Sequence, residues 1–407
     1  MTTQEQQVAP VAVEKKNAAL VGTPLLLLGV ALAAANLRPA ITSIGPLLNE
    51  VRQSLGASEL WASVLTAVPT LCFGVAAFAT PLLARKIGLS RAVSAGLVVL
   101  TAGLLLRVVG GPWGMLAGTF VAAAGIAIGN VLIPVVVKQA FPDRIALGMT
   151  VFTAALMCGG GAGAAATPWL QDQLGGWRVT LAAWSLLSVA ALLIWLAGTR
   201  RTEERGAVPA QASAAPPERK LLVRSPLAWL ITGFFGLQAA GSYVLMGWAA
   251  DVFSSAGISQ SESGLLLALL VAGSLPITFV FVPLAMRSRS QSWWIVGLVG
   301  LEIIGTLGML ISPTSVPWLW SLLWGAGMGV FPIALGLFAV RARTTADTAG
   351  LSAMAQGFGY LLGAAGPFLF GLLHGSSGSW TVPMIMLAVI FGVDLVLGFV
   401  VGRPRHV

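Results

Sequence analysis

The stretch AAANLRPAITSIGPLL, residues 33–48, decides the fold, because it places Arg38 between two apolar runs that both have the composition of membrane-spanning sequence. The whole chain has the same character. Of its 407 residues, 57% are hydrophobic and 9% are charged, whereas soluble domains carry about 25% charged residues. The composition therefore predicts an integral membrane protein.

Apolar stretches long enough to span a bilayer recur along the chain. A bilayer core of about 30 Å needs roughly 20 apolar residues in a helix. Such stretches lie at 20–49, 59–84, 88–109, 112–138, 145–171, 176–198, 226–253, 262–286, 291–312, 315–341, 347–374 and 379–402. They predict an all-α membrane protein with twelve transmembrane helices.

The longest polar interruption divides these helices into two groups of six. It reads TRRTEERGAVPAQASAAPPERKLLVR and is charged and rich in Pro and Ala, which is typical of a flexible linker. We therefore expect an N-terminal tail at 1–19, a six-helix bundle at 20–198, a linker at 199–225, a second six-helix bundle at 226–402 and a C-terminal tail at 403–407.

Basic residues are distributed unevenly between the connections. If the N-terminus is inside, 19 of the 23 Lys and Arg fall in cytoplasmic segments, Arg38 lies within a helix, and the outer connections hold only Arg52, Arg107 and Arg178. This bias follows the positive-inside rule and predicts that both termini are cytoplasmic. The net charge of +9 is then explained by the basic residues that set the orientation in the membrane. Nucleic acid is therefore not an expected partner.

The two halves resemble each other. Lys138 and Arg341 each close an apolar helix, 203 positions apart, and Pro134 and Pro332 each follow a run of small residues, 198 positions apart. Halves related in this way are typical of transporters built from parallel repeats, whose substrate lies between the halves near the middle of the membrane. We expect the binding site there.

Residues that would indicate an enzyme or a metal site are missing from the sequence. The two cysteines lie inside apolar runs and the two histidines are far apart, so no disulfide framework or metal-ligand spacing exists. The sequence has no G-x-x-x-x-G-K-[ST] motif for an ATP-driven motor and no cluster of groups suited to catalysis. We therefore expect no metal, no cofactor and no enzymatic activity.

Arg38 lies near the middle of the first predicted helix, where an unpaired charge costs several kcal/mol. Carboxylates are scarce, and the mid-helix acids are Glu302 and Asp394 in the ninth and twelfth helices. Backbone carbonyls and amides such as Asn130 could hold the guanidinium. Alternatively, an anionic or strongly dipolar substrate could supply the missing acceptor, which would make Arg38 the central substrate-binding residue.

Other polar and aromatic residues within helices are candidate substrate contacts, although helix packing would explain each of them equally well. Together with Arg38 they provide donors and apolar walls suited to a small ligand. They are Asn36, Asn130, Gln238, Tyr243, Trp248, Phe331, Gln356 and Tyr360.

At these residues the chain resembles a known family. The segments NLRPAITSIGPLL, GIAIGNVLIPVVVKQAFPDR, LSAMAQGFGYLLGAAGP and GLLHGSSGSW are similar to those of the cyanate/nitroimidazole transporter family of the major facilitator superfamily. The resemblance covers essentially the whole membrane portion. It implies the major facilitator fold, alternating access and a bacterial inner membrane. The motif positions that carry over are Asn36, Arg38, Pro39, Asn130, Lys138, Gln356 and Tyr360.

Two departures from the family pattern concern gating and the pocket. The loop after the second helix reads PLLARKIGLSR, with Arg85 where the superfamily usually has Asp, so the gating ion pair of that Asp is in question. Met328 stands where the family tends to place Gln, which would change the pocket. We assign gating or structural roles to Arg85, Pro39, Pro134, Lys138 and Pro332.

These observations predict a monomeric transporter in the lipid bilayer that moves a small anionic or polar solute, cyanate-like or nitroimidazole-like. Protons are a candidate second partner through Glu302 and Asp394, because like charges at low dielectric favour retention of a proton. A structural role for this pair, an interface with another protomer, anion exchange and facilitated diffusion remain alternatives.

A proton-coupled multidrug exporter is the alternative function. The glycine-rich fifth and eleventh helices favour it. The absence of a carboxylate from most of the inner helices counts against it, and Arg38 would repel a cationic drug. A non-transporting sensor would need a soluble output domain, and no predicted loop is large enough to hold one.

Overall fold

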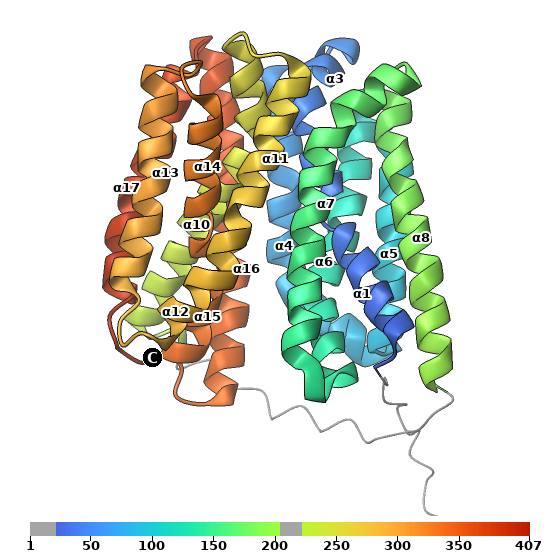
Figure 1. Cartoon of the computed structure of the whole chain (residues 1–407), viewed down its shortest axis with the longest axis vertical. Helices are drawn as coiled ribbons and strands as arrows, with labels where there is room; N and C mark the ends of the chain where they lie inside the picture. Colours follow the sequence, from blue (N-terminus) through green and yellow to red (C-terminus); the bar gives the residue numbers. More distant parts are fainter. Residues whose placement is uncertain (1–21, 204–221) are drawn as a thin grey trace, which may run out of the picture.

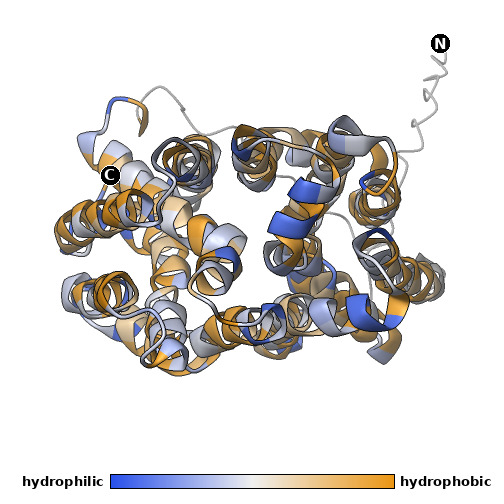
Figure 2. Ribbon diagram, turned by 90° about the horizontal axis from the view of Figure 1, so that it is seen from above, coloured by the Kyte–Doolittle hydropathy of each residue, from blue (hydrophilic) through white to orange (hydrophobic). Residues whose placement is uncertain are grey.

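The computed structural model describes residues 22–203 and 222–407. The N-terminal tail expected at 1–19 and most of the expected linker lie outside the described residues. Within them, twelve helical stretches are long and apolar enough to cross a membrane, which confirms the all-α, twelve-span prediction. The helices form two bundles that lie side by side (Figure 1), and hydrophobic residues dominate most of them when they are viewed from above (Figure 2).

The first half comprises spans one to six. Its elements are α1 (Pro24–Ala35), α2 (Pro39–Thr42), η1 (Gly45–Leu47), α3 (Leu48–Ser54), α4 (Glu59–Ile87), α5 (Leu89–Leu106), α6 (Gly111–Ala140), η2 (Pro142–Arg144), α7 (Ile145–Leu174) and α8 (Trp177–Glu203). The first span uses four of these elements, so it is not a single helix.

The second half comprises spans seven to twelve. Its elements are α10 (Pro226–Ser255), α11 (Gln260–Pro276), the π-helical η3 (Ile277–Phe281), α12 (Val282–Arg287), α13 (Ser292–Ile311), α14 (Pro317–Gly327), α15 (Val330–Arg341), α16 (Thr345–Ser377) and α17 (Thr381–Val401). Spans eight and ten are therefore irregular as well.

The break in the first span corrects our expectation of one continuous helix at 20–49. Pro39 has no N–H group, so the carbonyl of Ala35 cannot accept the usual helical hydrogen bond, and α1 ends at that residue. Pro46 has the same effect about two turns later, where η1 follows α2. Two prolines thus divide the span around Arg38.

Small residues allow other helices to approach this break. A Cβ atom added at Gly159 of α7 would lie 2.0 Å from the Ala35 carbonyl oxygen, which no side chain could tolerate without a shift. The helix is close because glycine exposes only backbone at this contact. The run of glycines in α7 is therefore explained first by packing against the broken span.

The two halves contact each other along two helix pairs, α4 with α16 and α7 with α11. At the end of the molecule that carries α3 (Figure 1), Gln260 Nε2 donates a hydrogen bond to the Pro46 carbonyl oxygen at 2.9 Å. A Cβ atom at Gly375 of α16 would lie 2.6 Å from Cβ of Glu59 in α4. Side chains from both halves therefore meet closely at this end.

We predict that Gly159→Ala destabilises the purified protein, because the added methyl group collides with backbone rather than with a movable side chain. Overpacking of this kind costs about 1–3 kcal/mol, which should lower the melting temperature in detergent by several degrees. Gly297→Ala is the matched control, since nothing lies within 4 Å of its added Cβ. Equal melting temperatures for the two variants would contradict this account of the α1–α7 contact.

Candidate functional site

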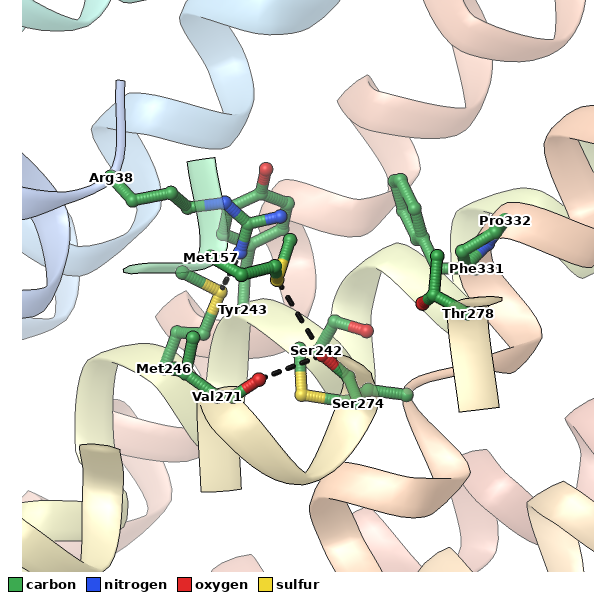
Figure 3. Close-up of a pocket in the computed structure, with 11 residues that line it drawn as sticks. Arg38, Met157, Ser242, Tyr243, Met246, Val271, Ser274, Thr278, Phe331 and Pro332 are labelled. Carbon is green, nitrogen blue, oxygen red and sulfur yellow. Dashed lines mark hydrogen bonds between the residues drawn. The ribbon is translucent and has the colours of Figure 1, made fainter. Parts of the chain in front are cut away.

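A cavity with an empty volume of about 490 Å³ lies between the two halves (Figure 3). The first half contributes Arg38 and Met157, and the second half contributes the remaining lining residues. Those are Ser242, Tyr243, Met246, Val271, Ser274, Thr278, Met328, Phe331 and Pro332. A pocket shared between the halves agrees with the repeat argument from the sequence.

Irregular backbone surrounds this pocket in three spans. Arg38 is the N-cap of α2, Met328 stands at the break between α14 and α15, and Thr278 lies within the π-helical η3. Non-helical backbone within a membrane is tolerated only where it is buried in protein or lines a cavity. The two helix breaks and the π-helical stretch therefore mark the same place as the cavity.

Arg38 has few partners within the described part of the chain. Its Nη1 atom donates to Sδ of Met246 at 2.8 Å, and a thioether is a weak acceptor for a guanidinium that offers five N–H donors. The one ion pair between described residues joins Arg52 to Glu59, so Arg38 has no carboxylate partner there. Arg38 is half-buried, and Figure 3 shows its guanidinium beside Tyr243 and Met246.

Hydroxyl groups and aromatic rings make up the rest of the wall. Ser242 is 3% exposed, and its buried Oγ atom has no hydrogen-bond partner among the described residues. Ser274 Oγ donates to the Val271 carbonyl oxygen at 2.7 Å. Phe331 and Thr278 lie across the pocket from Arg38 (Figure 3).

Tyr360 of α16 lies behind this wall. Its ring centroid is 6.4 Å from those of both Tyr243 and Phe331, and 5.0 Å from that of Phe235 in edge-to-face contact. Such aromatic contacts hold rings in fixed orientations. Tyr360 therefore supports two pocket residues.

Three of the predicted substrate contacts, Arg38, Tyr243 and Phe331, line the cavity. Asn36 instead donates from Nδ2 to the Leu32 and Leu187 carbonyl oxygens at 2.8 and 3.1 Å, which ties the end of α1 to α8. The structure therefore gives Asn36 a role in holding the helix break.

The remaining candidates also have other surroundings. Gln238 Nε2 donates to Glu302 Oε1 at 3.1 Å, and Trp248 Nε1 donates to the carbonyl oxygen of Pro367 at 3.1 Å. Gln356 Nε2 donates to Ser352 Oγ at 2.7 Å. Asn130 is half-buried in α6 and is not among the lining residues.

The predicted gating positions fall into two groups. Pro39 begins α2 and Pro332 lines the pocket within α15, so both lie at helix breaks. Pro134 lies inside the continuous α6, while Arg85 and Lys138 are exposed near the C-terminal ends of α4 and α6. No described residue forms an ion pair with Arg85.

Arg107 has a role that the sequence did not reveal. It directly follows the last residue of α5, in the connection where we placed it, but it is 1% exposed. Its Nη1 atom donates to the Ala40 carbonyl oxygen at 2.8 Å and its Nη2 atom to the Leu181 carbonyl oxygen at 3.3 Å. Ala40 precedes Pro46 in the broken span, where Ile44 N–H bonds instead to Ile41. Arg107 therefore replaces a missing helical hydrogen bond.

The pocket hydroxyls were also missed. Ser242, Ser274 and Thr278 lie in apolar helices, where a single hydroxyl is common and carries little signal. Ser242 directly precedes Tyr243, which was predicted. Only the three-dimensional course of α10 shows that Ser242 lines the cavity as well.

Twelve spans in two halves, with a pocket lined by residues of both, are the architecture of a membrane transporter. The chain belongs to the Major Facilitator Superfamily, whose family model matches residues 26–364. Two relatives from Escherichia coli (strain K12) are similar to it. The 2-nitroimidazole transporter is 30% identical over 94% of this chain and 96% of its own length. The cyanate transport protein CynX is 32% identical over 87% of this chain and 91% of its own length. The protein is therefore a membrane transport protein and not an enzyme, and the resemblance seen in the sequence is confirmed.

A solved structure has the same fold. The inward-facing, unoccupied form of a bacterial homologue of the human lysosomal transporter Spinster gives a TM-score of 0.75, at 13% identity, over 94% of this chain and 98% of that chain. The sequences have diverged widely, so this similarity concerns the arrangement of the helices alone.

We predict that Arg107→Met and Arg38→Met differ in their effect on stability. Removing Arg107 leaves the Ala40 carbonyl oxygen without its partner, and a buried unsatisfied group costs about 1–3 kcal/mol. Removing Arg38 takes away only a contact with a thioether. The melting temperature of detergent-purified protein should therefore fall clearly for Arg107→Met and little for Arg38→Met. The reverse order would show that Arg38 is the structural arginine.

Proposed function

We propose that the protein transports a small anionic or strongly dipolar solute, cyanate-like or nitroimidazole-like, and that Arg38 binds the electron-rich end of that solute. The observation that carries the proposal is the shortage of acceptors around the Arg38 guanidinium, which has one weak sulfur partner and faces a cavity. A charge in this position is stabilised when the substrate supplies the acceptor.

The composition of the pocket supports this class of solute. The hydroxyl of Ser242 has no partner among the described residues and could donate a second hydrogen bond to a ligand that reaches it. Tyr243 and Phe331 offer flat apolar surfaces that suit a small aromatic ring. A nitro group or a cyanate ion combines a compact electron-rich end with little bulk, which fits one arginine and one hydroxyl. The relatives named for a nitroimidazole and for cyanate agree with this chemistry.

A cationic drug suits the site less well. The described lining contains no carboxylate, and the single charged lining residue is Arg38. The positive guanidinium would repel a cation at the low dielectric of a membrane interior. A multidrug exporter of cations is therefore the less favoured candidate.

We further propose alternating access in the inner membrane of a bacterium, with both termini cytoplasmic, as the distribution of basic residues indicates. The contacts between the halves at the α3 end then close the outer side. The breaks at Arg38 and at Met328 are suited to act as hinges, because broken helices change direction at small cost. Pro39, Pro332 and Pro134 are the prolines that would assist this motion, and Arg85 and Lys138 lie at the inner side where the opposite closure would form.

Substitution of Arg38 tests the substrate proposal. Loss of a charge-assisted hydrogen bond costs about 1.5–3 kcal/mol, which corresponds to roughly a tenfold or greater loss of affinity. Arg38→Ala should therefore abolish the thermal shift that cyanate or 2-nitroimidazole gives the wild-type protein, and should abolish counterflow of the same compound in proteoliposomes. Arg38→Lys should retain little of either, since it keeps the charge but loses the forked donor geometry.

Arg91→Ala is the matched control, because Arg91 is exposed on α5 and has no ion-pair partner in the described residues. It should bind as wild type does. Full counterflow by Arg38→Ala protein would refute the proposed role of Arg38. A thermal shift with cationic drugs and none with the anion or the nitroimidazole would favour the exporter instead.

A further inference from the structure

Two acidic residues lie buried outside the pocket and are not used by the proposed binding mechanism. Glu302 of α13 and Asp394 of α17 are both 0% exposed. Gln238 of α10 is also 0% exposed, and its amide donates to Glu302 Oε1 at 3.1 Å. The three side chains come from three helices of the second half, and α17 packs against both α10 and α13.

The packing of α10 against α17 brings Gln238 to the level of Asp394. A Cβ atom at Gly398 would lie 2.9 Å from the Phe234 ring, and one at Gly241 would lie 2.3 Å from the Phe391 ring. These contacts show that α10 and α17 run in opposite directions. Gln238 lies one turn after Phe234 on α10, and Asp394 lies one turn before Gly398 on α17. These two residues therefore occupy matching positions on the facing helices.

This cluster, which we define as Gln238, Glu302 and Asp394, contains more acceptors than donors. Glu302 Oε2, both carboxyl oxygens of Asp394 and Gln238 Oε1 have no hydrogen-bond partner among the described residues. The Gln238 amide N–H is the one donor that reaches a member of the cluster. Buried oxygens without donors are strongly unfavourable, and buried carboxylates even more so.

Nearby charged groups do not relieve this shortage. On the elements that pack against α13 and α17, the charged or titratable residues are Tyr243 and Asp251 on α10, Arg341 on α15, and Asp347, Tyr360 and His374 on α16, while α14 has none. Arg341 is bonded to the Val401 and Gly402 carbonyl oxygens and to Gln291 Oε1. No ion pair joins a described Lys, Arg or His to either carboxyl group.

We propose that Gln238, Glu302 and Asp394 form a proton-binding site that couples proton movement to transport of the solute in the central pocket, a role that rests on the proposed function. A carboxylate that takes up one proton becomes a neutral carboxylic acid with one O–H donor. That O–H group supplies the donor that the cluster lacks, and the Gln238 carbonyl oxygen or the second carboxylate can accept from it. Release of the proton restores the carboxylate, so each cycle moves one proton.

Two structural links connect the cluster to the pocket. Gln238 lies one helical turn from Ser242 on α10, and Ser242 lines the pocket. A Cβ atom at Gly327 would lie 2.2 Å from Cγ of Glu302, so the end of α14 rests on the Glu302 side chain. Met328, the next residue, lines the pocket at the helix break. A change in the charge of the cluster therefore acts on two walls of the pocket.

The coupling is tested with full-length protein in proteoliposomes, with cyanate and 2-nitroimidazole as probes. Glu302→Gln and Asp394→Asn keep the side-chain shapes but cannot take up a proton. Both variants should lose accumulation driven by a pH gradient by at least tenfold and keep counterflow, which needs no gradient. Glu262→Gln is the matched control, because Glu262 is an exposed acid on α11, and it should behave as wild type does.

Unchanged gradient-driven accumulation in both variants would overturn the proposal. Accumulation driven by a sodium gradient and abolished in the same variants would also overturn it and would assign the cluster to a monovalent cation.

A second measurement does not depend on the solute. Infrared difference spectra of the purified wild-type protein, recorded between neutral and alkaline pH, should contain the carbonyl band of buried protonated carboxyl groups, and that band should be reduced in Glu302→Gln and Asp394→Asn. Absence of this band from the wild type would refute the proton site even if neither probe is transported. Its presence without any transport would instead leave the site intact and refute the proposed substrates.

Discussion

The structure depends on one constraint, which is that backbone polar groups inside a membrane must find partners within the protein. The helical hydrogen bonding of the first span is interrupted at Pro39 and Pro46. The interruption is tolerated because other groups bond to the backbone there. Arg107 donates to the carbonyl oxygen of Ala40, and Asn36 joins the end of α1 to α8. With the break held in this way, Arg38 occupies a non-helical position from which its side chain enters the pocket between the halves.

Arg38, Arg107 and Arg341 show how differently one side chain can be used in this environment. Arg107 and Arg341 are 1% and 3% exposed, and each donates to two backbone carbonyl oxygens. Arg38 is less buried and donates to one sulfur atom. Arg107 and Arg341 are held by backbone carbonyl oxygens, although Arg107 Nε has no partner among the described residues, and this suits a structural role. Only Arg38 keeps most of its donors available beside a cavity, and this difference is the basis for assigning the substrate to it.

Hydropathy and charge patterns predicted the twelve spans, and Arg38 could be singled out because a charge in an apolar run is conspicuous. Its neighbours in the pocket could not be predicted as well. Asn36, Gln238 and Trp248 attracted attention as polar or aromatic residues in helices, yet each bonds to a group outside the pocket lining. Ser242, Ser274 and Thr278 line the pocket although hydroxyls are common in membrane helices. The direction in which a side chain points depends on helix rotation, which a proline or a π-helical turn alters.

The sequence by itself determined that this chain is a twelve-span membrane protein with a cationic group inside its first apolar stretch, because the hydrophobic effect acts on composition and span length, which are local properties. Tertiary structure alone decided which arginine is bonded to backbone and which keeps most of its donors beside a cavity, since Arg107, in the turn after α5, reaches backbone that lies 67 positions away. It also brought Gln238 beside Glu302, 64 positions apart. Partners separated by this much chain are chosen by the packing of whole helices, and that packing is a collective property of the fold.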